Sequence, residues 1–103
     1  MVDVVKSATF DRWLRRLKDR RAAARVEVRI DRLAAGNPGD AKPVGRGVSE
    51  LRIDYGPGYR VYYLQDGQQL IVLLCGGSKS GQDHDIEEAQ RLAQEWRRHG
   101  RHG

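Results

Sequence analysis

The sequence predicts an α+β fold with the element order β-α-α-β-β-β-α. Apolar residues recur at helical spacing in residues 10–33 and 86–96. Between these two regions, residues 48–64 alternate apolar and polar side chains, as in strands with one buried face. Gly and Pro fall at the boundaries between these periodic segments. A chain of 103 residues fits one domain, because single hydrophobic cores commonly serve chains of about this length.

The N-terminal elements are predicted to be a short strand and a helical hairpin. Residues 1–6 contain three valines, which favour a β-strand. Ser7 is expected to cap a helix over residues 8–18, and Asp19 a second helix that ends at Gly36-Asn37. The apolar stripes of the two helices are Phe10, Trp13, Leu14 and Leu17, then Ala22, Val26, Ile30 and Leu33. Residues 37–47 are rich in Gly and Pro and are predicted to be a loop.

The C-terminal half is predicted to contain three strands and one helix. If Gly56-Pro57-Gly58 is a three-residue loop between the first two strands, Arg52 lies opposite Tyr62. Asp66-Gly67 marks the next turn, and residues 70–75 are apolar throughout, as expected of an interior strand covered on both faces. Residues 76–81 break this strand. A last helix follows, with acidic residues at its start, basic residues at its end and Gly100 as a stop signal.

The alternation gathers polar side chains on one sheet face, which we expect to be open. These residues are Glu50, Arg52, Asp54, Arg60 and Tyr62. The two arginines can pair with the carboxylates as solvated ion pairs. Alternatively, arginines fixed on strands can stabilise the charge of a phosphoryl transition state. Both interpretations remain open at this point.

The charge balance favours a polyanionic partner. Lys and Arg number 19 against 14 Asp and Glu, and the formal net charge is +5. Four arginines form a stripe along the second predicted helix: Arg21, Arg25, Arg29 and Arg32. Like charges at this spacing repel one another, and a bound polyanion would relieve the repulsion. A solvated basic face explains the stripe equally well.

Two residues between the last strand and the last helix are candidates for catalysis. Lys79 lies in a glycine-rich segment at a helix start, where backbone N–H groups favour anions, although the spacing is not that of a P-loop. His84 follows at the start of the helix and can transfer a proton, although a lone histidine is more often a surface residue.

Signals for metals, cofactors and membranes are absent from the sequence. No His, Cys and carboxylate cluster has ligand spacing for zinc, so we expect neither metal nor cofactor. The single cysteine, Cys75, lies in an apolar run and is predicted to be a core residue. No apolar run approaches the length of a membrane span and no leader segment is evident, so we expect a cytoplasmic protein without a membrane partner.

Five segments together resemble one known family. They are residues 10–19, 36–40, 47–53, 55–63 and 75–80, which include Glu-Leu-Arg-Ile at 50–53 and Tyr-Gly-Pro-Gly-Tyr-Arg-Val-Tyr-Tyr at 55–63. The chain resembles the addiction-module killer proteins, the HigB-like branch of the RelE/ParE toxin superfamily. The resemblance spans nearly the whole chain. It implies a single toxin domain over residues 1–103. From its basic composition, the end of the chain at 96–103 is predicted to be a frayed tail.

The resemblance implies a helical hairpin packed on a curved, mainly antiparallel sheet. It also implies a ribosome-dependent endoribonuclease that cuts messenger RNA without a metal ion, through attack of a ribose 2′-hydroxyl on the adjacent phosphate. By position, Arg52, Arg60 and Lys79 match the family's basic active residues. The C-terminal tyrosine of RelE has no counterpart, so His84, Asp83 or Asp85 would replace it. The RNA-binding set is then Arg21, Arg25, Arg29, Arg32 and Tyr62.

Partners and alternatives also follow from the resemblance. A free toxin would kill its host, so a cognate antitoxin is expected, with a helix-turn-helix repressor as its predicted type. The superfamily includes ParE-like inhibitors of DNA gyrase, and the fold alone does not separate the two activities. A non-enzymatic nucleic-acid-binding module would also explain the net charge and the arginine stripe.

Overall fold

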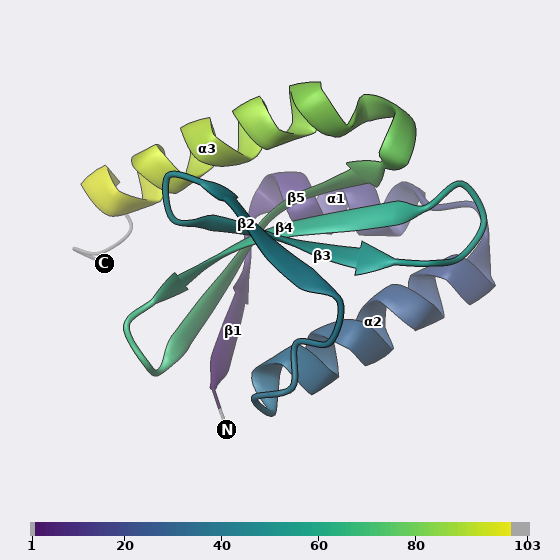
Figure 1. Cartoon of the computed structure of the whole chain (residues 1–103), viewed down its shortest axis with the longest axis horizontal. Helices are drawn as coiled ribbons and strands as arrows, with labels where there is room; N and C mark the ends of the chain where they lie inside the picture. The colour runs from purple at the N-terminus through teal and green to yellow at the C-terminus, as the bar shows by residue number, and fades with distance from the viewer. Residues whose placement is uncertain (1, 100–103) are drawn as a thin grey trace.

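A five-stranded sheet with helices on both faces forms the centre of the computed structural model, which describes residues 2–99 (Figure 1). In chain order the elements are β1 Asp3–Lys6, α1 Ala8–Arg16, α2 Arg20–Ala34, β2 Ala41–Gly45, β3 Val48–Ile53, β4 Tyr59–Asp66, β5 Leu70–Ser78, a 3-10 turn Lys79–Gly81 and α3 Gln82–His99. The strand order is β1-β5-β4-β3-β2. β1 runs parallel to β5, and the other neighbours are antiparallel. The predicted α+β fold is confirmed.

Both helices of the N-terminal hairpin begin at the predicted caps. Ser7 Oγ accepts a hydrogen bond from the Phe10 backbone N–H at 2.9 Å. Asp19 Oδ1 accepts bonds from the first backbone N–H groups of α2. α2 is followed by Gly36, whose φ of 90° lies in the left-handed region that glycine adopts without strain. α1 ends at Arg16, slightly before the predicted residue 18, because Leu17 already has extended backbone.

The helices enclose two apolar cores, one on each side of the sheet. α1 and α2 cover one face, where Phe10, Val26 and Leu51 are fully buried. α3 lies on the opposite face, where Ala89 and Ala93 pack against Val72 and Leu74 of β5. Figure 1 shows α3 and α2 on opposite sides of the strands. The interior strand predicted for residues 70–75 is confirmed, since β5 lies between β1 and β4.

The segment predicted as a loop, residues 37–47, contains the edge strand β2. It pairs antiparallel with β3 through a turn at Arg46 and Gly47, both of which have positive φ. The sequence pattern is weak here because the strand is short, includes Pro43 and is exposed on much of its length. Proline lacks a backbone donor, and an edge strand tolerates it. This strand brings Asp40 next to β3, where its carbonyl accepts from the Arg52 N–H at 2.9 Å.

The predicted register between β3 and β4 was wrong by two residues. Arg52 pairs with Arg60 rather than with Tyr62, and Ile53 pairs with Tyr59. The loop is longer than three residues because Asp54 and Tyr55 belong to it, and the Tyr55 ring lies under the Arg25 guanidinium at 4.5 Å. A shift of two residues preserves the side-chain period, so each residue still points to the predicted face.

The glycines after residue 75 do not break β5, which continues to Ser78. A Cβ at Gly76 would collide with the Trp13 ring from α1, and a Cβ at Gly77 with the Asp85 carboxylate from α3. The two glycines therefore let both helical layers approach the strand. The frayed tail predicted for residues 96–103 was wrong for residues 96–99, which belong to α3, and residues 100–103 lie outside the described part.

Candidate active site

Arg52 and Arg60 lie directly opposite each other on β3 and β4. Directly opposed residues of an antiparallel pair project to the same face, so both guanidinium groups are on the side of the sheet that α3 covers. This agrees with the alternation in the sequence, which placed both on one face. The pairing follows from the longer loop between the strands, and it brings the two cations closer than the predicted register would.

Lys79 joins the two arginines around one hollow of about 360 Å³, which we call the β3–β4 hollow. Its lining residues are Asp40, Arg52, Asp54, Gly58, Arg60 and Lys79. The Lys79 backbone N–H donates to the Gly58 carbonyl at 2.7 Å and so ties the end of β5 to the loop. Gly58 has a φ of 82° and lies close to both Lys79 and Arg60. A side chain at this position would strain the backbone, although its Cβ would have only ordinary contacts with Lys79 and Arg60.

Arg52 is held in place by Asp40, the residue before β2. Its Nε and one terminal nitrogen donate to the same carboxylate oxygen at 3.1 and 2.8 Å. Arg29 of α2 fixes this region by donating to the carbonyls of Arg52, Pro38 and Asp40. The Gly45-Arg46-Gly47 sequence is a turn signal that, taken with Val44, could have revealed β2 and the proximity of Asp40 to Arg52.

Arg60 is the more deeply placed of the two arginines, with 11% of its side chain exposed. Its Nε lies 3.9 Å from Oε1 of Glu50, which is fully buried. Tyr62 is also fully buried, and its hydroxyl donates to Oε2 of Glu50 at 3.2 Å. The expectation of an open sheet face was therefore wrong at these positions, because α3 packs over them. Tyr62 belongs to the core under α3 and does not present its ring to RNA.

Residues 12–97 match the sequence model of the family described as phage-derived Gp49-like proteins. The chain belongs to the Gp49-like family. This is a family of RelE-like toxins found in addiction modules. A protein of Haemophilus influenzae described as uncharacterized is 52% identical to this Gp49-like chain over 94 residues, covering 91% of the chain and 95% of that protein.

His84 of the Gp49-like chain lies beside the β3–β4 hollow but does not line it. It is exposed in the first turn of α3 and lines a neighbouring hollow of about 400 Å³, the α3 hollow, with Lys79 and residues 80–83. Lys79 lines both hollows and so connects the two. Asp85, on the inner side of the same turn, is partly buried, and this burial raises its pKa above the usual value. The structure thus brings Arg52, Arg60 and Lys79 together and leaves His84 one hollow away.

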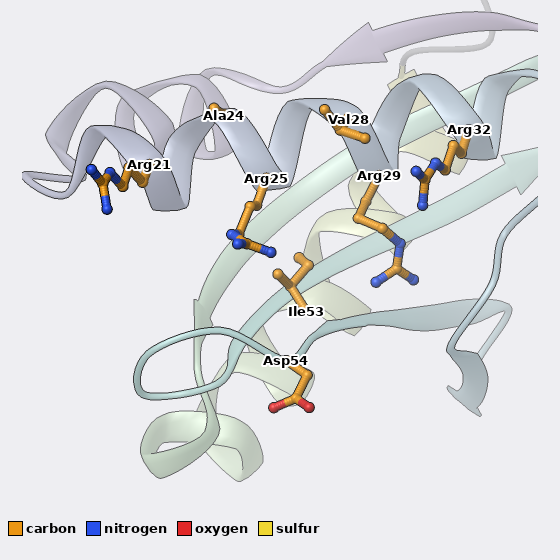
Figure 2. A pocket seen from close by; sticks show the side chains of 8 residues that line it. All are labelled: Arg21, Ala24, Arg25, Val28, Arg29, Arg32, Ile53 and Asp54. Atoms are coloured by element: carbon orange, nitrogen blue, oxygen red, sulfur yellow. The ribbon is translucent and has the colours of Figure 1, made fainter.

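The arginine stripe lines a larger groove of about 620 Å³ between α2 and the end of β3, which we call the α2 groove. Its lining residues are Arg21, Ala24, Arg25, Val28, Arg29, Arg32, Ile53 and Asp54, and Figure 2 shows their side chains. Arg25 and Arg29 are engaged with Tyr55 and with backbone carbonyls, respectively. Asp54 lines both the α2 groove and the β3–β4 hollow, so the two surfaces meet around the end of β3.

Cys75 is a core residue in the Gp49-like fold, as predicted. It is buried under α3, and this burial raises the pKa of its thiol to about 12. The thiol is therefore protonated at neutral pH and is a poor nucleophile. Within residues 2–99, no group of three or more His, Cys, Asp or Glu side chains is arranged to hold a metal ion. None of the described helices is both long and apolar enough to span a membrane.

Proposed function

We propose that this Gp49-like toxin is a HigB-like, ribosome-dependent endonuclease that cuts messenger RNA at the β3–β4 hollow. The observation that carries the proposal is the convergence of three cationic side chains, Arg52, Arg60 and Lys79, around one hollow. Each comes from a different strand or strand end, so the sheet fixes their spacing. A scissile phosphate carries extra negative charge in its transition state, and preorganised cations stabilise that charge.

The proposed reaction needs alignment, charge neutralisation and the movement of two protons. The ribose 2′-oxygen forms a bond to phosphorus while the bond from phosphorus to the 5′-oxygen breaks. The products are a 2′,3′-cyclic phosphate and a free 5′-hydroxyl. One proton leaves the attacking 2′-hydroxyl and another reaches the 5′-oxygen. Arg52 and Arg60 neutralise the phosphoryl oxygens, and Lys79 binds the phosphate or the leaving oxygen.

His84 is the proposed proton-transfer residue, with Asp83 and Asp85 as alternatives from the same turn of α3. Its position in the α3 hollow, across Lys79 from the arginines, supports a contact with substrate that spans both hollows. Replacing each of the three residues separately and recording the pH dependence of kcat identifies the group that moves the proton.

The α2 groove is the proposed path of the RNA backbone toward the β3–β4 hollow. The four arginines Arg21, Arg25, Arg29 and Arg32 supply positive charge along it, and Asp54 marks the place where the groove meets the hollow. Tyr62 is not part of this proposal because α3 covers it. The cytoplasm is the proposed location, since the substrate is ribosome-bound messenger RNA. A helix-turn-helix antitoxin is the proposed partner.

Cleavage of ribosome-bound messenger RNA by the purified toxin tests the function directly. We expect cuts in the messenger and no effect on DNA supercoiling by gyrase. Arg60→Ala is expected to lower kcat by about 100-fold to 1000-fold, as when one donor to a transition-state anion is lost. Arg12→Ala, on the exposed side of α1, is the matched control and should retain activity. Inhibition of gyrase without RNA cleavage would instead support the ParE-like alternative.

A further inference from the structure

A fully buried carboxylate lies directly behind the Arg60 guanidinium. Glu50 of β3 has no exposed surface between the sheet and α3. Its Oε2 accepts hydrogen bonds from Gln82 Nε2 at 2.7 Å and from the Tyr62 hydroxyl at 3.2 Å. A buried carboxylate is costly unless donors and a cation surround it. Arg60 supplies the cation at this position.

The contact between Glu50 and Arg60 leaves one atom of each side chain without a hydrogen bond. Arg60 Nε lies 3.9 Å from Glu50 Oε1, and neither atom has a hydrogen-bond partner among the described residues. The terminal nitrogen Nη1 of Arg60 donates to the Tyr59 carbonyl at 3.3 Å and lies near Gly58, at the rim of the β3–β4 hollow. The Nε edge of the guanidinium therefore faces the carboxylate, while Nη1 lies on the side of the hollow.

Glu50 also connects three elements of the fold. It belongs to β3, Tyr62 to β4, and Gln82 is the first residue of α3. Burial and the neighbouring Glu50 carboxylate raise the pKa of the Tyr62 hydroxyl, so this group remains a hydrogen-bond donor throughout the neutral range. The hydrogen bonds from Tyr62 and Gln82 thus hold the Glu50 carboxylate in place independently of Arg60.

We propose that Glu50 is a positioning residue that orients the Arg60 guanidinium toward a phosphate in the β3–β4 hollow. The phosphate as ligand rests on the proposed function, whereas the orientation of Arg60 by Glu50 does not. A purely structural ion pair would stabilise the fold without affecting the reaction, so the two interpretations differ in measurable ways.

Steady-state kinetics on the Glu50→Gln variant tests the effect on the reaction. This substitution keeps the size of the side chain and removes its charge. We expect kcat for cleavage of ribosome-bound messenger RNA to fall roughly tenfold to a hundredfold, with a smaller change in KM. In an Arg60→Ala background the same substitution should cause no further loss, because Glu50 acts through Arg60. An unchanged kcat, or a full additional loss in the double variant, would overturn the proposal.

Nuclear magnetic resonance of the Arg60 Nε–H group tests the orientation of the Arg60 side chain and does not require a measurement of RNA cleavage. In the wild-type toxin we expect this proton to exchange slowly with water, and in Glu50→Gln to exchange faster and change its chemical shift. Glu87→Gln, at an exposed position of α3, is the control with the same chemical change and should leave the Arg60 signal unchanged. If Glu50→Gln does not fold, Glu50→Asp retracts the carboxylate by one methylene and should give the same direction of change. An Arg60 signal that ignores both Glu50 substitutions would overturn the proposal.

The two experiments separate this inference from the proposed function. If the toxin does not cleave RNA but its Arg60 signal responds to Glu50→Gln, the proposed nuclease activity is wrong and the orientation of Arg60 by Glu50 is supported. If the toxin cleaves RNA but its Arg60 signal does not respond, the nuclease activity is supported and the proposed role of Glu50 is wrong.

Discussion

The two arginines of the β3–β4 hollow, Arg52 and Arg60, have different carboxylate partners within the protein. Asp40 occupies two nitrogens of Arg52, the same donors that a phosphate would use in a paired contact. Arg60 faces the buried Glu50 instead. The Asp40 pair is exposed to solvent, so its contribution to stability is small and an incoming phosphate can replace it.

Removing the Asp40 charge is expected to tighten RNA binding. Asp40→Asn frees Arg52 and removes one negative charge from the hollow, for a gain of about 0.5–1 kcal/mol, or roughly twofold to fivefold in Kd. The measurement is fluorescence titration with a single-stranded RNA whose 2′-hydroxyls are methylated, so that it cannot be cleaved. Asp3→Asn on β1, at the opposite edge of the sheet, is the control with the same change in net charge. Weaker binding by Asp40→Asn would show that the carboxylate assists the site.

Among the elements, β5 determines how closely the two helical layers approach the sheet. Gly76 lies against Trp13 of α1, and Gly77 against Asp85 of α3. From the sequence, these glycines predicted a break in the strand, because glycine is common in turns. The structure shows why they continue the strand instead. The reason is a contact between residues far apart in the chain, which local sequence does not report.

Gly76→Ala is expected to destabilise the fold by about 1–3 kcal/mol, because the added methyl group collides with the Trp13 ring. Unfolding in urea, followed by tryptophan fluorescence and circular dichroism, gives the free energy of unfolding. In a double-mutant cycle, Trp13→Leu should relieve much of the loss caused by Gly76→Ala. Additive losses from the two substitutions would contradict the close contact.

At the scale of the whole molecule, positive charge is distributed over two surfaces that meet at Asp54. The formal net charge of +5 predicts attraction to polyanions but does not say where they bind. The fold gathers the arginine stripe of α2 along one groove, and Arg52, Arg60 and Lys79 in a hollow beside it. The dependence of RNA affinity on salt concentration reports how many phosphates the cationic side chains neutralise.

Arg21→Ala combined with Arg32→Ala is expected to reduce the slope of log affinity against log salt by about 0.7 for each lost phosphate contact. These two exposed arginines line the α2 groove without the structural contacts of Arg25 and Arg29. Arg12→Ala combined with Arg16→Ala, on exposed positions of α1, is the control with equal net charge. Equal slopes for both double variants would remove the α2 groove from the proposed RNA path.

The sequence by itself determined the helices, the interior strand and the face to which the residues of β3 and β4 point, because these depend on local periodicity and capping. It also indicated, from the alternation of side chains, that Arg52 and Arg60 share a face. The predicted register was wrong by two residues, and a shift of two residues does not change the face to which a side chain points. Tertiary structure alone decided which residues meet. The edge strand brings Asp40 to Arg52, α3 buries Tyr62 and Glu50, and His84 lies in a separate hollow. Loop length and helix packing set these distances, and both depend on contacts between distant parts of the chain.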